Sequence, residues 1–395
     1  MRIAYISGVC VQYDAISDAV VEGVRNLLDD GAEVVLYTYQ CDYEDIPSRI
    51  VSEVGDIVGD PFFQSADVVI LHYGIFYPLF YALLAAPVDA RVLVTFHNIT
   101  PKELLPSWDR RLIEQSFEQL SLLSFADHVL CDSETNRSVL RSAGIATPAT
   151  VRSLGVDLSE APSEKPSFSD GVLRVAYVGR FVRSKGPQDL IAALDRGMPN
   201  ILHDRVSVQM VGNLGFSDSG LFSELVASAR DAELAHSGRL RIEIRGNVEN
   251  AEKNRILADA DLFVLPTYHE GFCVPILEAL AAGCRVITYE NSNTPAISGG
   301  FADLIPTGDV VALAEANEKG ARLVGDAAWV SDGYRRYITN TREYVSFFSR
   351  ARVKSRFLDI VGKFGRSETL KDDSFVPHLN AATDLSTGVP APTAA

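Results

Sequence analysis

The stretch ADLFVLPTYHEGFCVPILEALAAGC, residues 260–284, has the order strand, loop and helix. Its first seven residues form a short apolar run that ends in proline, which predicts a buried parallel strand. Pro275 suits the first turn of a helix, and Gly283 suits its end. Glu270 is therefore expected in the loop at the carboxyl end of a strand, and Glu278 in the opening turns of the helix. In open α/β sheets this edge is where ligands bind.

Glu270 and Glu278 lie eight positions apart across this loop-to-helix junction. Carboxylates accept hydrogen bonds from hydroxyl groups, so two of them at one sheet edge suit a polyhydroxylated ligand such as a sugar and a ribose. The spacing alone leaves a simpler alternative open. In that alternative Glu278 only stabilises the helix N-terminus, and Glu270 is a solvated loop residue.

Apolar runs alternate with helical stretches along both halves of the chain. The segments that predict strands are 3–7, 33–37, 68–72, 91–96, 128–132, 173–178, 206–211, 240–245, 261–265 and 284–288. Such alternation predicts parallel sheets covered by helices on both faces. Residues 154–169, which are rich in Ser and Pro, interrupt the alternation and predict a linker. We therefore expect an α/β protein with two doubly wound, Rossmann-like domains that face a central cleft.

A second motif, VAYVGRFVRSKGP at residues 175–187, places a glycine and two cations after a predicted strand. A diphosphate needs close backbone approach, here at Gly179. It also needs a guanidinium fork and an ammonium charge, here Arg180 and Lys185. Taken alone, this motif fits a solvated loop at least as well.

Together the two motifs resemble those of the retaining family 4 glycosyltransferases, which have the GT-B fold, and the similarity extends over residues 1–365. The resemblance implies that Arg180 and Lys185 grip the diphosphate of a nucleotide sugar. It implies that Glu278 holds the ribose and that Glu270 holds the transferred sugar. It also implies that the reaction needs no cofactor and no essential metal.

The resemblance adds further positions to the donor site. Val248, in the turn after the strand predicted at 240–245, would contact the nucleobase through its backbone. Gly8, after the first predicted strand, would approach the phosphates. The predicted donor-binding residues are Gly8, Gly179, Arg180, Lys185, Val248, Glu270, Gly271, Phe272, Cys273 and Glu278.

The first half of the chain contributes the sequence Phe-His-Asn at residues 96–98, directly after a predicted strand. A lone histidine is more often structural than catalytic. This motif is similar to the acceptor-side loop of the family, which implies that His97 contacts the transferred sugar and that Asn98 lies on the acceptor side. The predicted catalytic residues are His97, Arg180, Lys185 and Glu270.

The composition excludes several functions. The formal net charge of −16 argues against nucleic acid as a partner, because phosphate backbones need clustered Lys and Arg. The 5 cysteines lack metal-ligand spacing, and reduced thiols in a cytoplasmic protein are expected. The N-terminus lacks the apolar core of a signal peptide, and no apolar run has the ~20 residues of a membrane span.

Two acidic residues, Asp259 and Asp261, look like the Asp-x-Asp metal motif of other glycosyltransferases. They directly precede the buried strand, however, which indicates a structural role at the start of that strand. We therefore expect no metal ligand at this position.

The C-terminal part of the chain is basic, with nine Lys or Arg against two acidic residues in 335–366. A closing helix whose basic stems lie over apolar surface explains this composition, and we favour it. A basic patch that faces anionic lipid or a lipid-diphosphate acceptor is the alternative. The expected segments are an acceptor-side domain at 1–160, a donor domain at 161–345, the closing helix at 346–366 and a disordered tail at 367–395.

The expected function is retaining transfer of a sugar from a nucleotide-diphosphate donor to a glycan or lipid-linked glycan, in the cytoplasm or peripherally at the inner membrane face. Residues 97–101 and 269–278 are similar to bacterial surface-polysaccharide mannosyltransferase-like proteins, which makes GDP-mannose the first candidate donor. UDP-glucose, UDP-galactose and UDP-N-acetylglucosamine stay open. A sugar-nucleotide epimerase of the same fold and a non-catalytic subunit that binds nucleotide sugar or glycan are the rival functions.

Overall fold

The computed structural model covers residues 1–395 and describes all of them except 106–109, 159–160, 369, 371–382, 385–388 and 391–395. The chain divides into two compact units. Unit 1 consists of Met1–Gly155 and Arg350–Val376, and unit 2 of Val156–Ser349 and Pro377–Ala395.

Unit 1 is built on a seven-stranded parallel sheet with the order β3-β2-β1-β4-β5-β6-β7. Its strands are β1 (Arg2–Ile6), β2 (Glu33–Thr38), β3 (Ser48–Ile50), β4 (Val68–Tyr73), β5 (Arg91–Phe96), β6 (His128–Cys131) and β7 (Ala149–Val151). Its α-helices are α1 (Ala15–Asp29), α2 (Val54–Val58), α3 (Pro61–Gln64), α4 (Arg110–Leu120), α5 (Glu134–Ser142) and α14 (Arg350–Gly365). Short 3₁₀ turns are η1 (Pro78–Ala85), η2 (Lys102–Leu104) and η3 (Ser121–Phe125).

Unit 2 repeats the architecture with six parallel strands in the order β10-β9-β8-β11-β12-β13. The strands are β8 (Val172–Val178), β9 (Arg205–Val211), β10 (Leu240–Arg245), β11 (Leu262–Leu265), β12 (Arg285–Glu290) and β13 (Ala302–Pro306). The α-helices are α6 (Ser167–Asp170), α7 (Pro187–Gly197), α8 (Ser219–Ala235), α9 (Asn250–Asp259), α10 (Val274–Ala281), α11 (Thr294–Ser298), α12 (Val310–Val324) and α13 (Tyr334–Ser346). Short turns are η4 (Arg183–Lys185), η5 (Met198–Asn200), η6 (Leu214–Phe216) and η7 (Trp329–Gly333).

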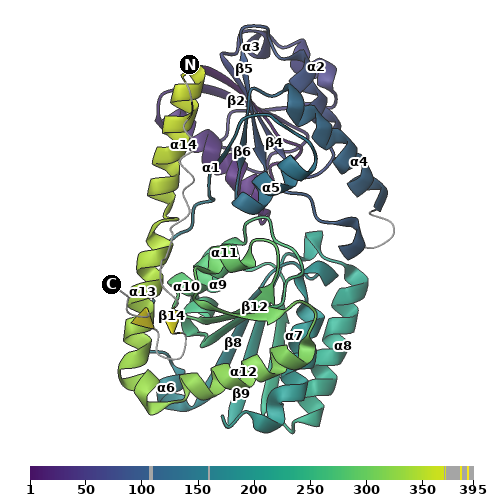
Figure 1. Cartoon of the computed structure of the whole chain (residues 1–395). Coiled ribbons are helices and arrows are strands. Elements are labelled where there is room, and N and C mark those ends of the chain that lie inside the picture. The colour runs from purple at the N-terminus through teal and green to yellow at the C-terminus, as the bar shows by residue number, and fades with distance from the viewer. Residues whose placement is uncertain (106–109, 159–160, 369, 371–382, 385–388, 391–395) are drawn as a thin grey trace. The chain divides into compact units, whose positions relative to one another are not determined.

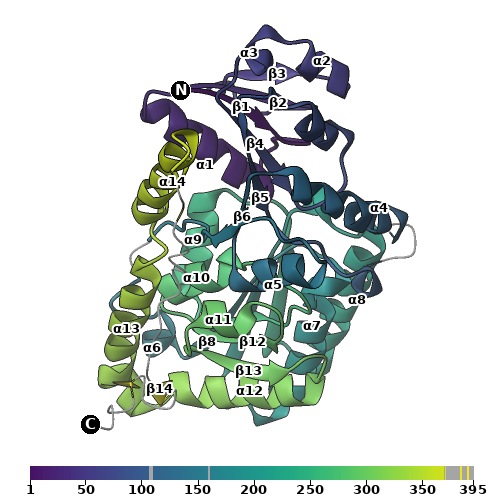
Figure 2. The same cartoon turned by 45° about the horizontal axis from the view of Figure 1, so that its top comes forward.

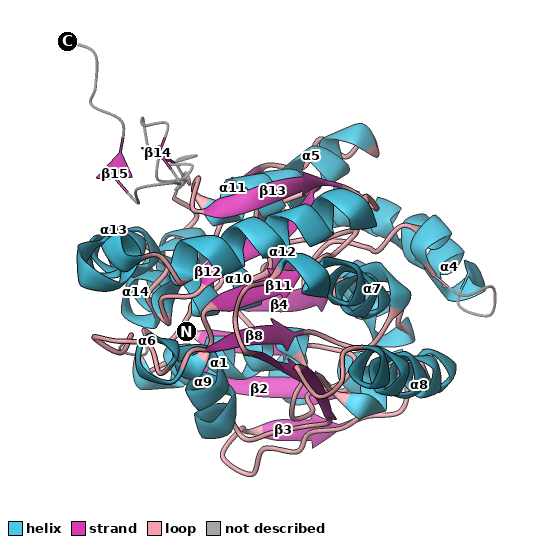
Figure 3. Cartoon of the chain, turned by 90° about the horizontal axis from the view of Figure 1, so that it is seen from below, coloured by secondary structure: helices cyan, strands magenta, loops and turns pink. Residues whose placement is uncertain are grey.

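Helices cover the strands of both units, as continuous apolar strands require. In unit 2, α7 packs against α8 and α12, while α10 packs against α9 and α13 (Figure 3). Two parallel Rossmann-like sheets confirm the predicted α/β architecture.

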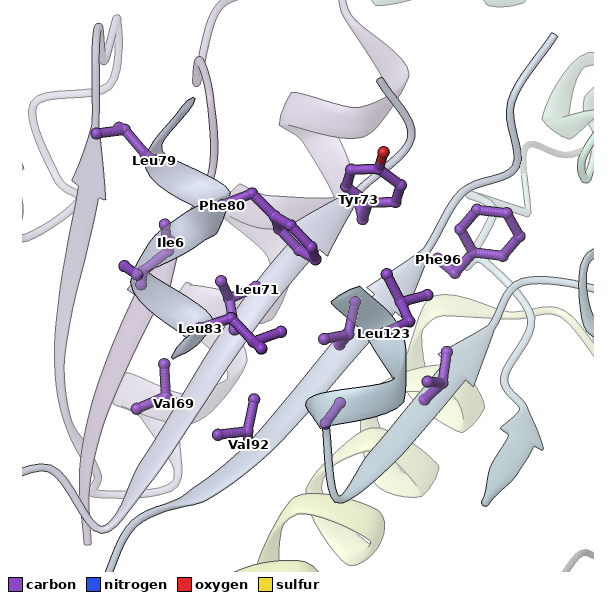
Figure 4. Packing of buried hydrophobic residues seen from close by; sticks show 14 of the residues in the cluster. Ile6, Val69, Leu71, Tyr73, Leu79, Phe80, Leu83, Val92, Phe96 and Leu123 are labelled. Carbon is purple, nitrogen blue, oxygen red and sulfur yellow. The ribbon is translucent and has the colours of Figure 1, made fainter. Parts of the chain in front are cut away.

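The sheet of unit 1 buries alternate side chains on opposite faces, because successive residues of a strand point to opposite sides. On one face, Ile6 and Leu71 pack with Phe80 and Leu123 from η1 and η3 (Figure 4). The opposite face, which carries Tyr5, packs against α1 and α14. Figure 2 shows α1 and α14 next to each other beside this sheet.

The last described helix, α14, belongs to unit 1 although the chain has already built unit 2 (Figure 1). Phe357, Ile360, Val361 and Phe364 are buried in the same apolar cluster as the residues of α1. Within the segment predicted as a closing helix, 346–366, the structure has α14 at Arg350–Gly365, which packs on unit 1.

The cations of α14 pair with unit 1. Arg350 bonds to Glu22 at 2.9 Å, and Lys354 to Asp29 at 2.6 Å. The apolar face of α14 is buried. This agrees with the favoured interpretation, in which the basic side chains of the helix lie over apolar surface.

Every predicted strand is present within about two residues, and three short strands, β3, β7 and β13, were not predicted. The predicted disordered tail at 367–395 lies mostly outside the described residues. Within it, β14 (Thr383–Asp384) pairs with β15 (Val389–Pro390) in antiparallel fashion. Among the described residues, no helix is both long and apolar enough to cross a membrane.

Candidate functional site

The order of strands in unit 2 reverses between β8 and β11, which are neighbours in the sheet but not in the chain. In open α/β sheets, ligands bind at such a switch point, beside the loops at the carboxyl ends of the strands. The two sequence motifs, 175–187 and 260–284, supply these loops.

The loops after β8 and β11 lie in direct contact. Gly186 ends the β8 loop with φ +62°, and a Cβ atom there would lie 2.0 Å from the carbonyl oxygen of Pro266. Further along, the Tyr268 N–H donates to the Ser184 carbonyl at 2.8 Å. The α7 helix then starts at Pro187, as the sequence predicted. These contacts fix the cations of one loop relative to the carboxylates of the other.

Lys185 and Glu270 form an ion pair across these loops. Lys185 Nζ lies 2.6 Å from Glu270 Oε1 and also donates to the His269 carbonyl at 3.3 Å. The side chains are only 18% and 9% exposed. A largely buried ion pair is costly to desolvate and is therefore weak evidence for a purely stabilising role.

Glu278, on the first turns of α10, is paired in the same way. Its Oε1 accepts a hydrogen bond from Lys253 Nζ at 2.6 Å, with side-chain exposures of 20% for the lysine and 17% for the glutamate. Lys253 lies on α9, after the turn that carries Val248. The sequence analysis missed Lys253. Lys253 comes close to Glu278 because α9 packs against α10. No pattern in the sequence indicates that contact.

Cys273 connects the carboxylate loop to α10 in an unusual conformation. It is the N-cap residue, with φ +82° and ψ +65°, and the residue is only 6% exposed. Burial, followed by the charge of Glu270, raises the pKa of the Cys273 thiol well above its usual range. The thiol therefore stays protonated beside Glu270. Nearby, burial and then the Lys185 charge lower the pKa of His269.

The remaining predicted donor residues of unit 2 lie in the loops after β8, β10 and β11. Arg180 is exposed and has no ion-pair partner in the described part of the chain, while Gly179 donates its N–H to the Val211 carbonyl at 3.0 Å. Gly271 follows Glu270 in the same loop. Phe272 is buried, and its carbonyl accepts from Asn293 Nδ2 at 2.9 Å. Val248 is half-buried at the end of the turn after β10.

Three predicted site residues belong to unit 1. Gly8 follows β1, and its carbonyl oxygen accepts hydrogen bonds from Tyr39 N–H and Thr38 Oγ1. His97 and Asn98 follow β5 at the carboxyl edge of the sheet. Both ring nitrogens of His97 are occupied: Nε2 lies 2.7 Å from His72 Nδ1, and Nδ1 lies 2.6 Å from Asp132 Oδ2.

The acidic pair before β11 has structural partners. Asp261 accepts a hydrogen bond from the Arg174 N–H at 2.8 Å, and Asp259 bonds to Arg255 at 3.1 Å. Asp261 thus ties the start of β11 to β8, which agrees with the predicted structural role. In the described residues, no group of three or more His, Cys, Asp or Glu could hold a metal ion.

The edge of unit 2 therefore combines two carboxylates with three cations. Carboxylates accept from hydroxyl groups, and the Arg and Lys side chains bind phosphate oxygens. This chemistry fits a ligand that carries both an anionic group and several hydroxyl groups.

Comparisons with known proteins match both units. Residues 160–319 match the family described as glycosyl transferases group 1, and residues 60–160 match the glycosyltransferase family 4 description. A solved sucrose-phosphate synthase from Thermosynechococcus elongatus superposes with a TM-score of 0.72 over 93% of this chain and 100% of its own, at 18% identity. The chain has the GT-B fold, and a segment of each unit matches a glycosyltransferase family.

Curated relatives of these glycosyltransferase domains include proteins of different specificity. The α-maltose-1-phosphate synthase of Mycolicibacterium smegmatis is 25% identical over 69% of this chain and 72% of its own length. The O-antigen chain mannosyltransferase B of Escherichia coli is 24% identical over 56% of this chain and 59% of its own length. The Lys185–Glu270 and Lys253–Glu278 pairs both lie within the matched segment of unit 2.

Proposed function

We propose that this chain is a retaining glycosyltransferase that moves a hexose from a nucleotide-diphosphate donor, held by unit 2, to a hydroxyl group of a glycan or lipid-linked glycan. The observation that carries the proposal is the largely buried Lys185–Glu270 pair at the switch point of the sheet. A nucleotide-sugar donor breaks the bond between its sugar and its diphosphate. The ammonium group would bind the diphosphate side of that bond, and the carboxylate would bind the sugar side.

Donor binding would exchange partners within this pair. Lys185 would leave Glu270 for the diphosphate, and exposed Arg180 would join it, so that two cations stabilise the charge that develops on the leaving group. Glu270 would then accept hydrogen bonds from hydroxyl groups of the transferred sugar. Glu278, shared with Lys253, would hold the ribose hydroxyls.

The identity of the donor is a finer proposal. GDP-mannose is the first candidate, and the E. coli mannosyltransferase among the relatives supports it. The UDP-sugars named above are the alternatives. We also propose that transfer needs no metal, since Arg180 and Lys185 would supply the positive charge; activity should survive a chelator.

A thermal-shift screen across nucleotide sugars tests the donor. A ligand that binds only the folded state stabilises it by about 2.7 kcal/mol at one hundred times its Kd, so the true donor should raise the melting temperature most. Lys185→Ala should reduce this shift. Arg183→Ala is the matched control, because Arg183 lies in the same turn but pairs with Glu224 on the surface at 2.8 Å.

Product analysis tests the reaction itself. Retention predicts that NMR finds the product with the anomeric configuration of the donor, and inversion would contradict it. An epimerase would convert the donor sugar without an acceptor. A non-catalytic binding subunit would shift in the thermal screen but show neither transfer nor donor hydrolysis sensitive to Glu270→Ala.

The cellular setting is also a proposal. We place the reaction in the cytoplasm, where peripheral contact with the inner membrane face through residues 335–366 stays a prediction. The ion pairs that Arg350 and Lys354 make within unit 1 leave fewer free cations for anionic lipid than the sequence suggested.

A further inference from the structure

A chain of hydrogen bonds links four side chains at the carboxyl edge of the unit 1 sheet. Tyr5 Oη lies 2.7 Å from His72 Nε2, His72 Nδ1 lies 2.7 Å from His97 Nε2, and His97 Nδ1 lies 2.6 Å from Asp132 Oδ2. The His97 and Asp132 side chains are 5% and 3% exposed. We call this set the Tyr5–Asp132 chain.

The fold brings the four residues together from separate strands. β1, β4, β5 and β6 are consecutive in the sheet, and their parallel register places the four side chains on the same face. Their sequence neighbours Tyr73 and Phe96 lie in the apolar cluster that Figure 4 draws, and therefore on the opposite face, because successive strand residues alternate. The polar chain thus occupies positions that apolar residues fill elsewhere along these strands.

One arrangement of protons satisfies every partner along the chain. Asp132 accepts from His97 Nδ1, and His97 Nε2 accepts from His72 Nδ1. His72 Nε2 then accepts from the Tyr5 hydroxyl. Burial is the main cause that lowers the pKa of His72 well below its usual value, which keeps the His72 ring neutral.

This arrangement leaves His97 without a free ring nitrogen for a substrate. The loop also holds His97 through its backbone, because its N–H donates to the Tyr73 carbonyl at 2.8 Å. Asn136 Nδ2 donates to the preceding carbonyl, that of Phe96, at 3.1 Å. The residue that these contacts fix in place is the next one, Asn98.

Asn98 combines a constrained backbone with an unused donor. Its φ is +74°, in the left-handed region, and the residue is 7% exposed. Its Oδ1 accepts from the Ile99 N–H at 2.7 Å, which fixes the amide orientation because a flipped amide would oppose two donors. Nδ2 is buried and has no hydrogen-bond partner within the described residues. A buried, unpaired donor of this kind needs an explanation, and a ligand atom that accepts from Nδ2 would supply one.

We propose that the Asn98 carboxamide donates a hydrogen bond to a sugar hydroxyl oxygen, and that the Tyr5–Asp132 chain is a positioning device that holds the His97–Asn98 turn for this contact. The hydroxyl belongs either to the transferred sugar or to the acceptor. The proposal rests on the proposed transfer function and changes one part of it: His97 is a positioning residue, and Asn98 touches the ligand.

Nitrogen-15 NMR of the histidine rings tests the proton arrangement without any substrate. At pH 7 we expect His72 and His97 to be neutral, with the proton on Nδ1 of each ring; His72→Gln and His97→Gln variants assign the signals. A proton on Nε2, or a charged ring, would overturn the positioning device. This result does not depend on whether the protein transfers a sugar.

Asn98→Asp tests the ligand contact. Aspartate tolerates positive φ and keeps an oxygen for the Ile99 N–H, but it removes the donor. We expect kcat/KM for transfer to fall at least about tenfold, the factor that one hydrogen bond supplies, with an unchanged affinity for the nucleoside diphosphate in unit 2. Asn98→Gly, which suits the same φ, should behave alike.

The kinetic step that Asn98→Asp impairs identifies which hydroxyl group Asn98 contacts. If donor hydrolysis in the absence of acceptor falls equally, the contact is to the transferred sugar. If only the acceptor KM rises, the contact is to the acceptor. Wild-type kcat/KM in both Asn98 variants would overturn the contact. A wild-type protein that transfers no sugar would instead contradict the proposed function.

Tyr5→Phe tests the positioning role. It leaves His72 Nε2 without its donor, so we expect kcat to fall and the acid limb of the pH–rate profile to move. Tyr73→Phe is the matched control, because Tyr73 is an adjacent buried tyrosine that donates to the Ser116 carbonyl from the opposite face. If Tyr5→Phe lowers only the melting temperature, as Tyr73→Phe should, the chain is merely structural.

Discussion

Cys273 shows how a single residue can store strain beside the Glu270 carboxylate. Its φ of +82° lies in a region that costs residues other than glycine roughly 1–2 kcal/mol. The surrounding loop imposes this conformation, because the Phe272 carbonyl is held by Asn293 and α10 starts at the next residue. A residue with a small side chain, or glycine, should therefore fit best at this position.

Substitutions at Cys273 should separate strain from packing. Cys273→Gly relieves the strain but loses the buried thiol and adds backbone freedom, so the free energy of unfolding should change by less than about 1 kcal/mol. Cys273→Val places a branched side chain at positive φ and should destabilise the protein by at least about 2 kcal/mol. Urea denaturation measures both, and equal effects would contradict the backbone explanation.

His72 should make stability depend on pH. Its folded pKa is lowered by burial, so the unfolded chain binds a proton at higher pH than the folded chain does. Stability is therefore complete above about pH 6.5 and falls as the pH drops below it, by up to about 1.4 kcal/mol per pH unit for this group. His203 and His269, whose pKa values are also lowered, add to the slope.

The variant His72→Gln isolates this contribution. Denaturation between pH 5 and 7 should show a shallower loss of stability in the variant than in the wild type. Parallel curves would mean that His72 carries its proton in the folded protein.

At the scale of elements, the contact between the loops after β8 and β11 sets the geometry of the site. Gly186 permits it, since any Cβ there would collide with the Pro266 carbonyl and would also sit at positive φ. We expect Gly186→Ala to separate the two loops, to destabilise the protein by about 2–4 kcal/mol and to weaken ligand binding by Lys185.

Gly171→Ala is the control for this prediction. Gly171 has φ +68° but open space around it, so its substitution adds only the conformational strain. Comparable loss of ligand affinity in both variants would show that the loop contact is unimportant.

The α14 helix should act as a structural element of unit 1. Phe357 is 1% exposed and packs against the same sheet face as α1, so Phe357→Ala should cost about 3–5 kcal/mol. Phe125→Ala, at a residue that is 66% exposed in the same unit, should cost almost nothing. Thermal unfolding followed by calorimetry distinguishes the two, and equal melting temperatures would contradict the packing of α14.

The elements that the sequence predicted and those that it missed differ physically. Central strands such as β11 are buried on both faces and are read as continuous apolar runs. The missed strands, β3, β7 and β13, all lie at sheet edges. β3 is three residues long and half-exposed, and β13 ends in proline, so neither offers an apolar run.

At the scale of the whole molecule, the chain passes from unit 1 to unit 2 at Gly155–Val156 and returns to unit 1 at Ser349–Arg350. Linker composition at 154–169 predicted the first crossing. Nothing local marks the second, because the apolar face of α14 would suit either unit and only the long-range packing with Tyr5 and α1 selects one.

The functional sites divide in the same way. The positions of Glu270 and Lys185 after their strands were predictable, since each lies in a motif whose spacing follows the strand that precedes it. The contacts of Lys253 and of the Tyr5–Asp132 chain were not, because they depend on which strands and helices become neighbours in the fold. Strand order is a property of the whole molecule.

The central claim is that Lys185 binds the diphosphate of a nucleotide sugar and that Glu270 binds its sugar. Isothermal titration of the donor and of its nucleoside diphosphate into Glu270→Gln, Lys185→Ala and the control Arg183→Ala tests it most directly. We predict that Lys185→Ala weakens both ligands roughly tenfold to a hundredfold, the range for a hydrogen bond to a charged group. Glu270→Gln should weaken only the nucleotide sugar. Equal weakening of both ligands by Glu270→Gln, or wild-type affinity in Lys185→Ala, would contradict the claim.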